Sequence, residues 1–224
     1  MGVVTRWSGE ATGKEYAGRF DALAATGVDV HGEATLCESL VAPPARVLDA
    51  GCGTGRVLIR LAERGFTGVG VDVDLSMLEV ARSRAPELRW VEADLSALDL
   101  GETFDLVIAA GNILPLVAEG TEAAVVGRLG THVVEGGLLV AGFGLDRAHL
   151  PRSGALVALA DYDAWCTDAG LRLETRLATW DGEPYAGGGY AVSIHRRGQA
   201  SGLPPGERGQ GRATGPRHVQ VGDQ

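Results

Sequence analysis

The sequence predicts an α/β protein built on a mostly parallel seven-stranded sheet, with an antiparallel last strand and helices on both faces. Three observations carry this prediction. Short apolar segments alternate with amphipathic helical segments between residues 45 and 197, which is typical of repeated strand–helix units. Three closely spaced glycines follow the first apolar segment, and the last two apolar segments alternate with polar residues.

In the first half of the sheet, apolar segments predict the strands, and capping residues and a proline predict where the helices begin and end. Residues 46–49 form a short apolar strand, and Thr54 is expected to cap the helix that follows. Residues 69–73 form a second buried strand, after which Asp74 is placed to cap a helix that ends near Pro86.

The second half continues the alternation and then changes character. Its expected elements are strands over 88–91 and 104–109, a helix over 121–134, a strand over 138–143 and a helix around Trp165. Residues 171–177 and 190–194 alternate apolar with polar side chains. Such alternation suits a partly exposed, antiparallel edge pair.

Segments at both ends of the chain stand apart from this core. Residues 1–44 are expected to form a helical segment, with Tyr16, Phe20 and Leu23 on one helix face. We expect this helix to cover the sheet, with a lid over a ligand site as the second interpretation. The core domain spans 45–197. Residues 198–224 hold seven glycines and three prolines and are predicted to be disordered.

Composition limits the classes of function. The chain has 224 residues, 45% hydrophobic and 22% charged, with a formal net charge of −9. The negative charge disfavours a nucleic-acid partner, and Lys14 as the only lysine excludes a catalytic lysine from the core. No apolar run suggests a signal peptide or a membrane span, and three dispersed cysteines suggest no disulfide or zinc site. We expect a cytoplasmic monomer or homodimer.

The segment Val47-Leu48-Asp49-Ala50-Gly51-Cys52-Gly53-Thr54-Gly55 is the most informative motif. Alternating glycines let the backbone turn tightly between a strand and a helix N-terminus, a typical site for nucleotide-like ligands. The spacing departs from the dinucleotide pattern G-x-G-x-x-G. Asp72, at the end of the second strand, is placed to accept hydrogen bonds from ribose hydroxyls.

Further motifs follow in order: Val-Gly-Val-Asp over 69–72, Glu92-Ala93-Asp94-Leu95, Phe104-Asp105-Leu106-Val107 and Gly136-Gly137-Leu138-Leu139. With these motifs, residues 45–197 resemble the class I S-adenosylmethionine-dependent methyltransferases, which have a Rossmann-like fold. The resemblance implies S-adenosylmethionine as cofactor, held by the glycine loop, with Asp72 on the ribose, Asp94 on the adenine amino group and Leu95 beside the base. The implied cofactor residues are Asp49, Gly51, Cys52, Gly53, Gly55, Asp72, Val73, Asp94, Leu95, Ala110, Gly111 and Asn112.

The sequence says less about the molecule that accepts the methyl group. The sequence lacks the Asn/Asp-Pro-Pro-aromatic motif of base-amine and glutamine methyltransferases, the Pro-Cys nucleophile of cytosine-C5 enzymes and the acidic set of metal-dependent catechol enzymes, so no metal is expected. The remaining polar candidates are His31, Glu33, Asn112, Asp146 and His149, of which His31 and Asn112 are weak catalytic candidates. Trp180 and Tyr185 lie in a glycine-rich connection that shapes acceptor pockets in relatives.

The prediction is a methyltransferase that acts on the oxygen or nitrogen of a small-molecule acceptor. Two alternatives remain open. One is an NAD(P)-dependent oxidoreductase, although the sequence has no Tyr-x-x-x-Lys pair. The other is a catalytically silent protein that binds S-adenosylmethionine.

Overall fold

The computed structural model describes residues 4–8 and 11–198. The predicted disordered tail therefore lies, from residue 199 on, outside the described residues. Seven strands form one sheet in the order β3-β2-β1-β4-β5-β7-β6. The strands are β1 (Arg46–Ala50), β2 (Thr67–Asp72), β3 (Arg89–Glu92), β4 (Phe104–Ala109), β5 (Val133–Gly144), β6 (Leu171–Leu177) and β7 (Tyr190–Arg197).

The pairing matches the predicted fold class. β1 to β5 are parallel, and β7 runs antiparallel to both β5 and β6. The strand order reverses beside β1, where a crevice opens at the carboxyl ends of β1 and β4. The ligand site of such a sheet is expected there.

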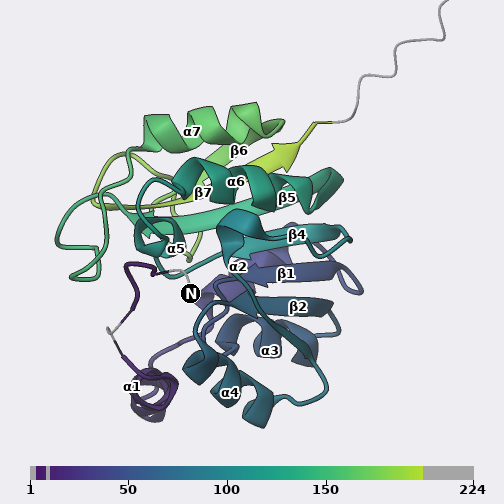
Figure 1. Ribbon diagram of the computed structural model, residues 1–224, viewed down its shortest axis with the longest axis vertical. Helices are drawn as coiled ribbons and strands as arrows, with labels where there is room; N and C mark the ends of the chain where they lie inside the picture. Colours follow the sequence, from purple (N-terminus) through teal and green to yellow (C-terminus); the bar gives the residue numbers. More distant parts are fainter. Residues whose placement is uncertain (1–3, 9–10, 199–224) are drawn as a thin grey trace, which may run out of the picture.

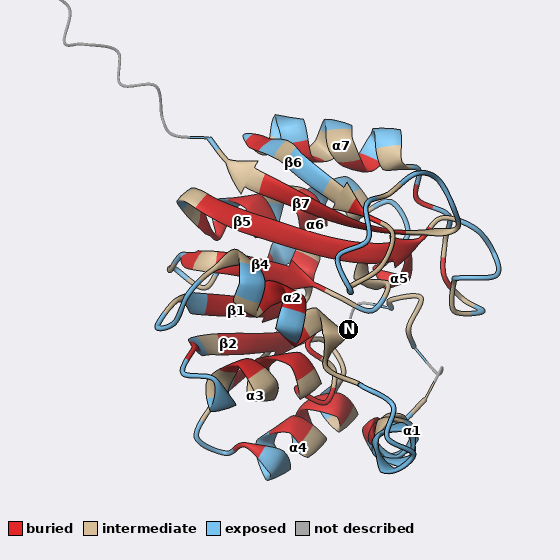
Figure 2. Cartoon of the chain, turned by 180° about the vertical axis from the view of Figure 1, so that it is seen from behind, coloured by how far each residue is buried: buried red, intermediate tan, exposed pale blue. Residues whose placement is uncertain are grey.

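Helices cover both faces of the sheet (Figure 1). One core cluster joins one face of the sheet to α2 (Gly32–Leu40), α3 (Arg56–Glu63) and α4 (Leu75–Arg84). The other cluster joins the opposite face to α6 (Glu122–Thr131), α7 (Leu159–Asp168) and the short 3-10 helix η1 (Leu95–Ala97). Figure 2 shows the central strands buried between these layers. The layers thus leave the strand ends, not the sheet faces, accessible to a ligand.

Three local expectations were wrong. Gly55, in the left-handed conformation, and not Thr54, precedes α3. Helix α6 ends at Thr131 because the β-branched residues Val133 and Val134 already belong to β5. β6 and β7 form the predicted antiparallel pair at one edge of the sheet, but β7 lies between β5 and β6 and is buried along most of its length, so the expected partial exposure holds for β6 alone. The alternating small polar residues of β7, such as Ser193, are buried instead.

The N-terminal segment forms two helices, α1 (Gly13–Ala25) and α2. α1 lies against α4 and not over the sheet (Figure 1). The close approach depends on Gly13, because a Cβ there would come within 2.1 Å of the Ser76 carbonyl oxygen. The Gly13 amide also donates to Ser76 Oγ at 3.0 Å. This contact fixes α1 beside the carboxyl ends of the first strands.

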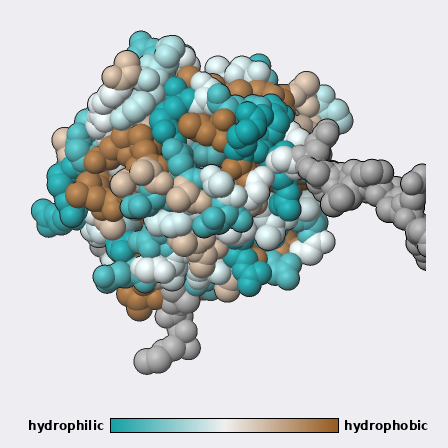
Figure 3. Space-filling model, turned by 90° about the horizontal axis from the view of Figure 1, so that it is seen from above, coloured by the Kyte–Doolittle hydropathy of each residue, from teal (hydrophilic) through white to brown (hydrophobic). Residues whose placement is uncertain are grey.

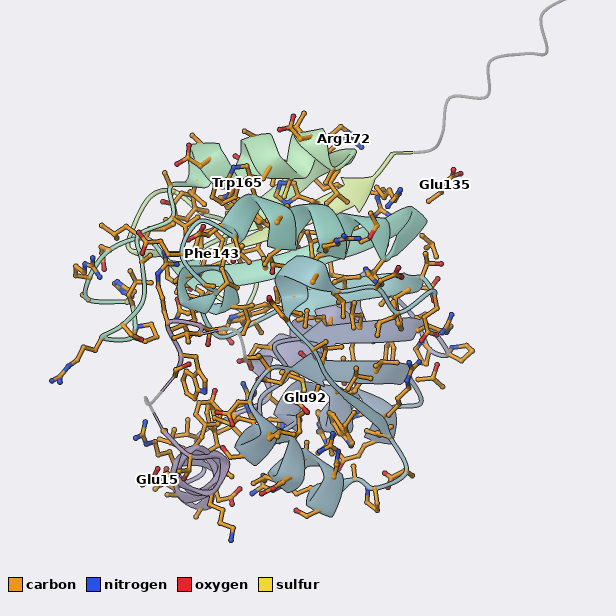
Figure 4. All side chains as sticks on the ribbon, viewed as in Figure 1. Glu15, Glu92, Glu135, Phe143, Trp165 and Arg172 are labelled. Carbon is orange, nitrogen blue, oxygen red and sulfur yellow. The ribbon has the colours of Figure 1, made fainter. Side chains whose placement is uncertain are left out.

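The molecular surface is mixed in character. The face seen in Figure 3 carries hydrophobic groups in separate patches between hydrophilic ones. Figure 4 shows the labelled Glu15 on α1 and Glu135 on β5 at opposite margins of the molecule, both directed outward. None of the described helices is long and apolar enough to cross a bilayer.

Candidate functional site: a cleft at the strand ends

A cleft opens at the carboxyl ends of β1, β2 and β4, where the strand order reverses. It contains about 940 Å³ of empty space, counting the solvent at its mouth. All the predicted cofactor residues line it except Gly55 and Asn112: Asp49, Gly51, Cys52, Gly53, Asp72, Val73, Asp94, Leu95, Ala110 and Gly111. The structure therefore gathers residues from four sequence segments into one site.

The glycine loop between β1 and α3 forms the floor of the cleft. Gly51 and Gly53 have φ angles of 75° and 53°, a conformation that glycine adopts without strain. A Cβ on Gly51 would come within 2.3 Å of Ile113 Cδ1, whereas a Cβ on Gly53 would meet nothing closer than 3.9 Å. Gly51 is thus required by packing, and Gly53 leaves open space where a ligand can approach the backbone.

Asp72 ends β2 and turns its carboxylate into the cleft. Its Oδ2 accepts a hydrogen bond from the Gly53 amide at 2.8 Å, and its Oδ1 accepts one from the Asp74 amide at 2.9 Å. Burial raises the pKa of Asp72, while these backbone hydrogen bonds oppose the rise. Each carboxylate oxygen keeps acceptor capacity for a ligand hydroxyl. The separate cap of α4 is Asp74, as the sequence predicts, since its side chain accepts from the Ser76 amide at 2.8 Å.

Asp94 and Leu95 form the next wall. The Asp94 carboxylate accepts from the Ser96 amide at 2.9 Å and from the Ser96 hydroxyl at 2.7 Å, which starts helix η1. Asp94 therefore has a structural role in this turn while also lining the cleft. Leu95 is 7% exposed and gives the cleft an apolar surface beside that carboxylate.

Asp49 is the most deeply buried of the cleft carboxyls. It is 2% exposed, and its Oδ2 accepts from the Leu58 amide at 3.3 Å, in the first turn of α3. This contact serves the helix start in place of a side-chain cap. Burial raises the pKa of Asp49 to about 7. The cleft therefore contains a carboxyl group that titrates close to neutral pH.

Three predicted residues lie outside the cleft. Gly55 starts α3 and makes room for Trp90, whose Cη2 atom would lie 2.5 Å from an added Cβ. Asn112 has a φ of 67°, and its Oδ1 accepts from the Gly144 amide at 2.7 Å. His31 lies just before α2 and makes no side-chain cap hydrogen bond. Gly55 and Asn112 thus shape the backbone around the cleft.

The N-terminal strap, defined here as residues 5–8, contributes cleft residues that the motifs do not reveal. Thr5 and Trp7 line the cleft together with Tyr16 of α1. Trp7 Nε1 donates to Asp74 Oδ2 at 3.0 Å, and its ring meets that of Tyr16 edge-on at 5.8 Å. An aromatic residue in an otherwise polar N-terminus was the available signal, but sequence spacing alone does not say where a strap crosses.

Arg56 joins the strap-bearing N-terminal segment to the glycine loop. Its guanidinium makes two hydrogen bonds to the Glu33 carboxylate, at 2.8 and 2.5 Å, and a third to the Val30 carbonyl. It also lies over the Phe20 ring, 4.5 Å from the centroid. Both partners of the ion pair are about 15% exposed. This paired, half-enclosed cation separates the cleft from a second cavity described below.

The cysteines in the described part of the chain are not suited to act as nucleophiles. Cys37, Cys52 and Cys166 are free and buried, and burial raises the pKa of each thiol. A thiol that stays protonated is a poor nucleophile. No cluster of three His, Cys, Asp or Glu side chains suited to a metal ion occurs among the described residues.

Known proteins share this fold and loop. Residues 47–137 match the family described as "Methyltransferase domain". The crystal structure of a TehB-like SAM-dependent methyltransferase from Corynebacterium glutamicum is 33% identical, with a TM-score of 0.74, and the match covers 83% of this chain and 97% of that one. The chain therefore belongs to the S-adenosylmethionine-dependent methyltransferases.

Two curated relatives share shorter segments. The magnesium-protoporphyrin O-methyltransferase of Rhodobacter capsulatus is 39% identical over 74 residues, which is 31% of this chain and 33% of that protein. The dTDP-3-amino-3,6-dideoxy-alpha-D-glucopyranose N,N-dimethyltransferase of Streptomyces fradiae is 32% identical over 119 residues, which is 51% of this chain and 47% of that protein. The match thus spans less than half the length of each of these two relatives.

Proposed function

We propose that this protein transfers a methyl group from S-adenosylmethionine, bound in the strand-end cleft, to a small-molecule acceptor. The observation that carries the proposal is the charge of the cleft. Three carboxyl groups line it, Asp49, Asp72 and Asp94. The cation among its lining residues, Arg56, is already paired with Glu33.

This charge distribution discriminates between the two cofactor classes that use such a sheet. S-adenosylmethionine carries a sulfonium cation, which neighbouring carboxylates attract. A dinucleotide carries a pyrophosphate, which the same carboxylates repel. The open space over Gly53 and the free acceptor capacity of Asp72 fit a nucleoside with ribose hydroxyls. The proposal therefore favours S-adenosylmethionine over a nicotinamide cofactor.

The chain's own residues have three tasks in this reaction. Asp72 would orient the ribose, the glycine loop would hold the methionyl portion, and Asp94 with Leu95 would hold the base. The bound cofactor supplies an electrophilic methyl group. The protein must then place the acceptor in line with that methyl and exclude water, and such positioning can contribute roughly 7–11 kcal/mol in favourable cases.

We also propose that residues 1–44 act as a lid, as their described part suggests. Trp7 and Tyr16 cover the cleft from the N-terminal side. The segment is held by Arg56–Glu33 and by Arg6, whose Nη1 lies 2.7 Å from Glu122 Oε1. Of this segment, the strap and α1 border the cleft, whereas α2 packs in the core, so the part that would open for cofactor exchange is the strap with α1.

Calorimetry tests the cofactor assignment. We expect S-adenosylhomocysteine to bind with micromolar affinity, about −8 kcal/mol, and NAD and NADP to show no heat of binding. Asp72→Asn should weaken S-adenosylhomocysteine binding by about 10- to 100-fold, or roughly 1–3 kcal/mol. Asp105→Asn is the matched control, since Asp105 lies on β4 outside the cleft and accepts from the Arg46 amide.

The outcomes separate the alternatives. Binding of a dinucleotide alone would refute the proposal and support the oxidoreductase interpretation. Binding of S-adenosylhomocysteine without methyl transfer to any acceptor would leave the catalytically silent binding protein. Equal affinities of the Asp72→Asn variant and the wild type would refute the ribose role of Asp72.

A further inference from the structure

A second cavity, the outer cavity, adjoins the cofactor cleft. It lies between the N-terminal helices and the loops around β7, and its lining includes Phe20, Glu33, His149, Trp180 and Tyr190. Arg56 lines both the cleft and the outer cavity. Because Arg56 lines both spaces, the outer cavity lies on the other side of this side chain from the cofactor cleft.

A histidine–carboxylate pair lies at this cavity. His149 Nδ1 is 2.7 Å from Asp146 Oδ1, and the same oxygen accepts from the amides of Ala148 and His149 at 3.0 and 3.1 Å. The hydrogen bond from His149 lowers the pKa of Asp146. An ionised Asp146 can only accept, so Nδ1 carries the proton and Nε2 is left with a free lone pair. Nε2 is therefore the ring atom able to take a proton from a ligand.

The pair is held in place by contacts that connect it to the cofactor cleft. Asn112 follows Gly111 of the cleft, and its side chain accepts from the Gly144 amide and donates to the His149 carbonyl at 3.5 Å. Gly189 makes room for the pair, since a Cβ there would lie 2.1 Å from Asp146 Oδ2 and 2.2 Å from His149 Nδ1. Asn112 is thus a positioning residue for His149.

The other titratable groups that line the outer cavity are less suited to accept a proton. Tyr190 Oη already accepts from Trp180 Nε1 at 3.0 Å, and burial raises the pKa of Tyr190 to about 12. Glu33 is engaged by Arg56. Asp29 accepts from the His31 amide at 2.8 Å, and like Asp181 it is a carboxylate, a weaker base than imidazole. Arg147, beside the pair in sequence, donates to the Gly154 carbonyl.

The lining also indicates the charge of the acceptor. Asp29, Glu33 and Asp181 face a single lining cation, Arg56, so the cavity disfavours anions. Its rim carries the exposed apolar side chains Leu23 and Val28, which are 45% and 51% exposed. An uncharged acceptor with an apolar body matches both features, and a base at the cavity is needed only where the reacting group is a hydroxyl.

We propose that His149, oriented by Asp146, is the general base that deprotonates an uncharged phenol-type hydroxyl in the outer cavity. This inference rests on the proposed methyltransferase function. His149 Nε2 takes the hydroxyl proton while the acceptor oxygen forms a bond to the methyl carbon. The sulfur–methyl bond breaks as this bond forms, and its electron pair stays on sulfur, which yields a methyl ether and S-adenosylhomocysteine. The protonated imidazole then releases its proton to water.

Three matched compounds test the proposed chemical class of the acceptor. Methyl 4-hydroxybenzoate is a neutral phenol, methyl 4-aminobenzoate is its amine counterpart and 4-hydroxybenzoate is its anionic counterpart. We expect S-adenosylhomocysteine release with the neutral phenol at a rate at least tenfold above that with either counterpart.

Variants test the pair. His149→Gln should lower kcat for the neutral phenol by about 100-fold or more, with unchanged S-adenosylhomocysteine affinity. Asp146→Asn should lower kcat less. A nitrogen-15 NMR spectrum of the cofactor-free protein gives a readout independent of activity: His149 should carry its proton on Nδ1, and Asp146→Asn should shift the proton partly to Nε2.

Each result decides the inference. Turnover of the amine alone, no turnover of the phenol, or a His149→Gln enzyme within twofold of wild type would refute the role of His149 as base. An Nε2-protonated His149 in the wild type would refute the orientation by Asp146. Failure of the wild type to bind S-adenosylhomocysteine would instead refute the cofactor assignment itself, so the two proposals fail separately.

Discussion

The Asp49→Asn variant tests whether burial in the cleft raises the pKa of the Asp49 carboxyl. The Asp49 carboxyl has its pKa raised from 3.8 to about 7 by burial, while in the unfolded chain it returns to its ordinary value. Between about pH 4 and pH 7 the folded protein therefore keeps a proton that the unfolded chain has lost. As pH rises from about 4 to about 7, this group therefore lowers the free energy of unfolding. Above about pH 7, the folded protein contains the ionised carboxylate in a buried site, which destabilises it by a constant amount.

The magnitude comes from the shift. One pKa unit corresponds to about 1.4 kcal/mol, so a rise of roughly three units amounts to about 4 kcal/mol at pH values above 7. Asparagine carries no charge, and its Oδ1 can still accept from the Leu58 amide, which Asp49 contacts at 3.3 Å. We expect Asp49→Asn to be more stable than wild type, with a gap that widens by about 2–3 kcal/mol between pH 5 and pH 8.

Urea denaturation followed by circular dichroism at several pH values measures the gap. Asp168→Asn, at an exposed position at the end of α7, is the control for simple loss of charge, and it should change stability by less than about 0.5 kcal/mol at every pH. The same Asp49→Asn protein should bind the cationic S-adenosylmethionine more weakly, because one of the carboxyl groups that line the cleft is lost. A gap that stays constant from pH 5 to pH 8 would refute the assignment of a raised pKa to Asp49.

Two further predictions concern the loop and the lid. Gly51→Ala should destabilise the protein by about 1–3 kcal/mol, because its φ is 75° and the new Cβ would meet Ile113. A lower thermal midpoint would measure this loss. The control is Gly127→Ala, which has open space around it and should not destabilise the protein; equal losses in the two variants would contradict the packing argument. Arg56→Gln should break the ion pair with Glu33 and increase hydrogen exchange across residues 13–40 while leaving α7 unchanged. Unchanged exchange in those residues would show that Arg56 does not hold the N-terminal segment.

Much of the fold and of the cleft could be predicted because both depend on local patterns. Apolar segments bounded by glycines and caps predicted the strands of the sheet, and β4 begins and ends where its apolar segment does. The cofactor residues follow strand ends, and the carboxyl ends of parallel strands meet at one edge of the sheet whatever the details of packing. Gly51, Asp72 and Asp94 could therefore be placed together from order along the chain alone.

Contacts between distant segments decided the rest. Trp7 is held at the cleft by its hydrogen bond to Asp74, and Gly13 lets α1 rest on Ser76 beside it. His149, one of the polar candidates in the sequence, pairs with Asp146 in space that Gly189, 40 positions further along the sequence, leaves open. Asn112, a weak catalytic candidate from sequence, proves to tie the His149 loop to β5. Burial also raises the pKa of Asp49, and no spacing along the chain reports burial. Local patterns along the chain predict the sheet, the glycine loop and the family. The side chains that line the outer cavity come together only through tertiary packing, because their contacts join residues that no local pattern relates.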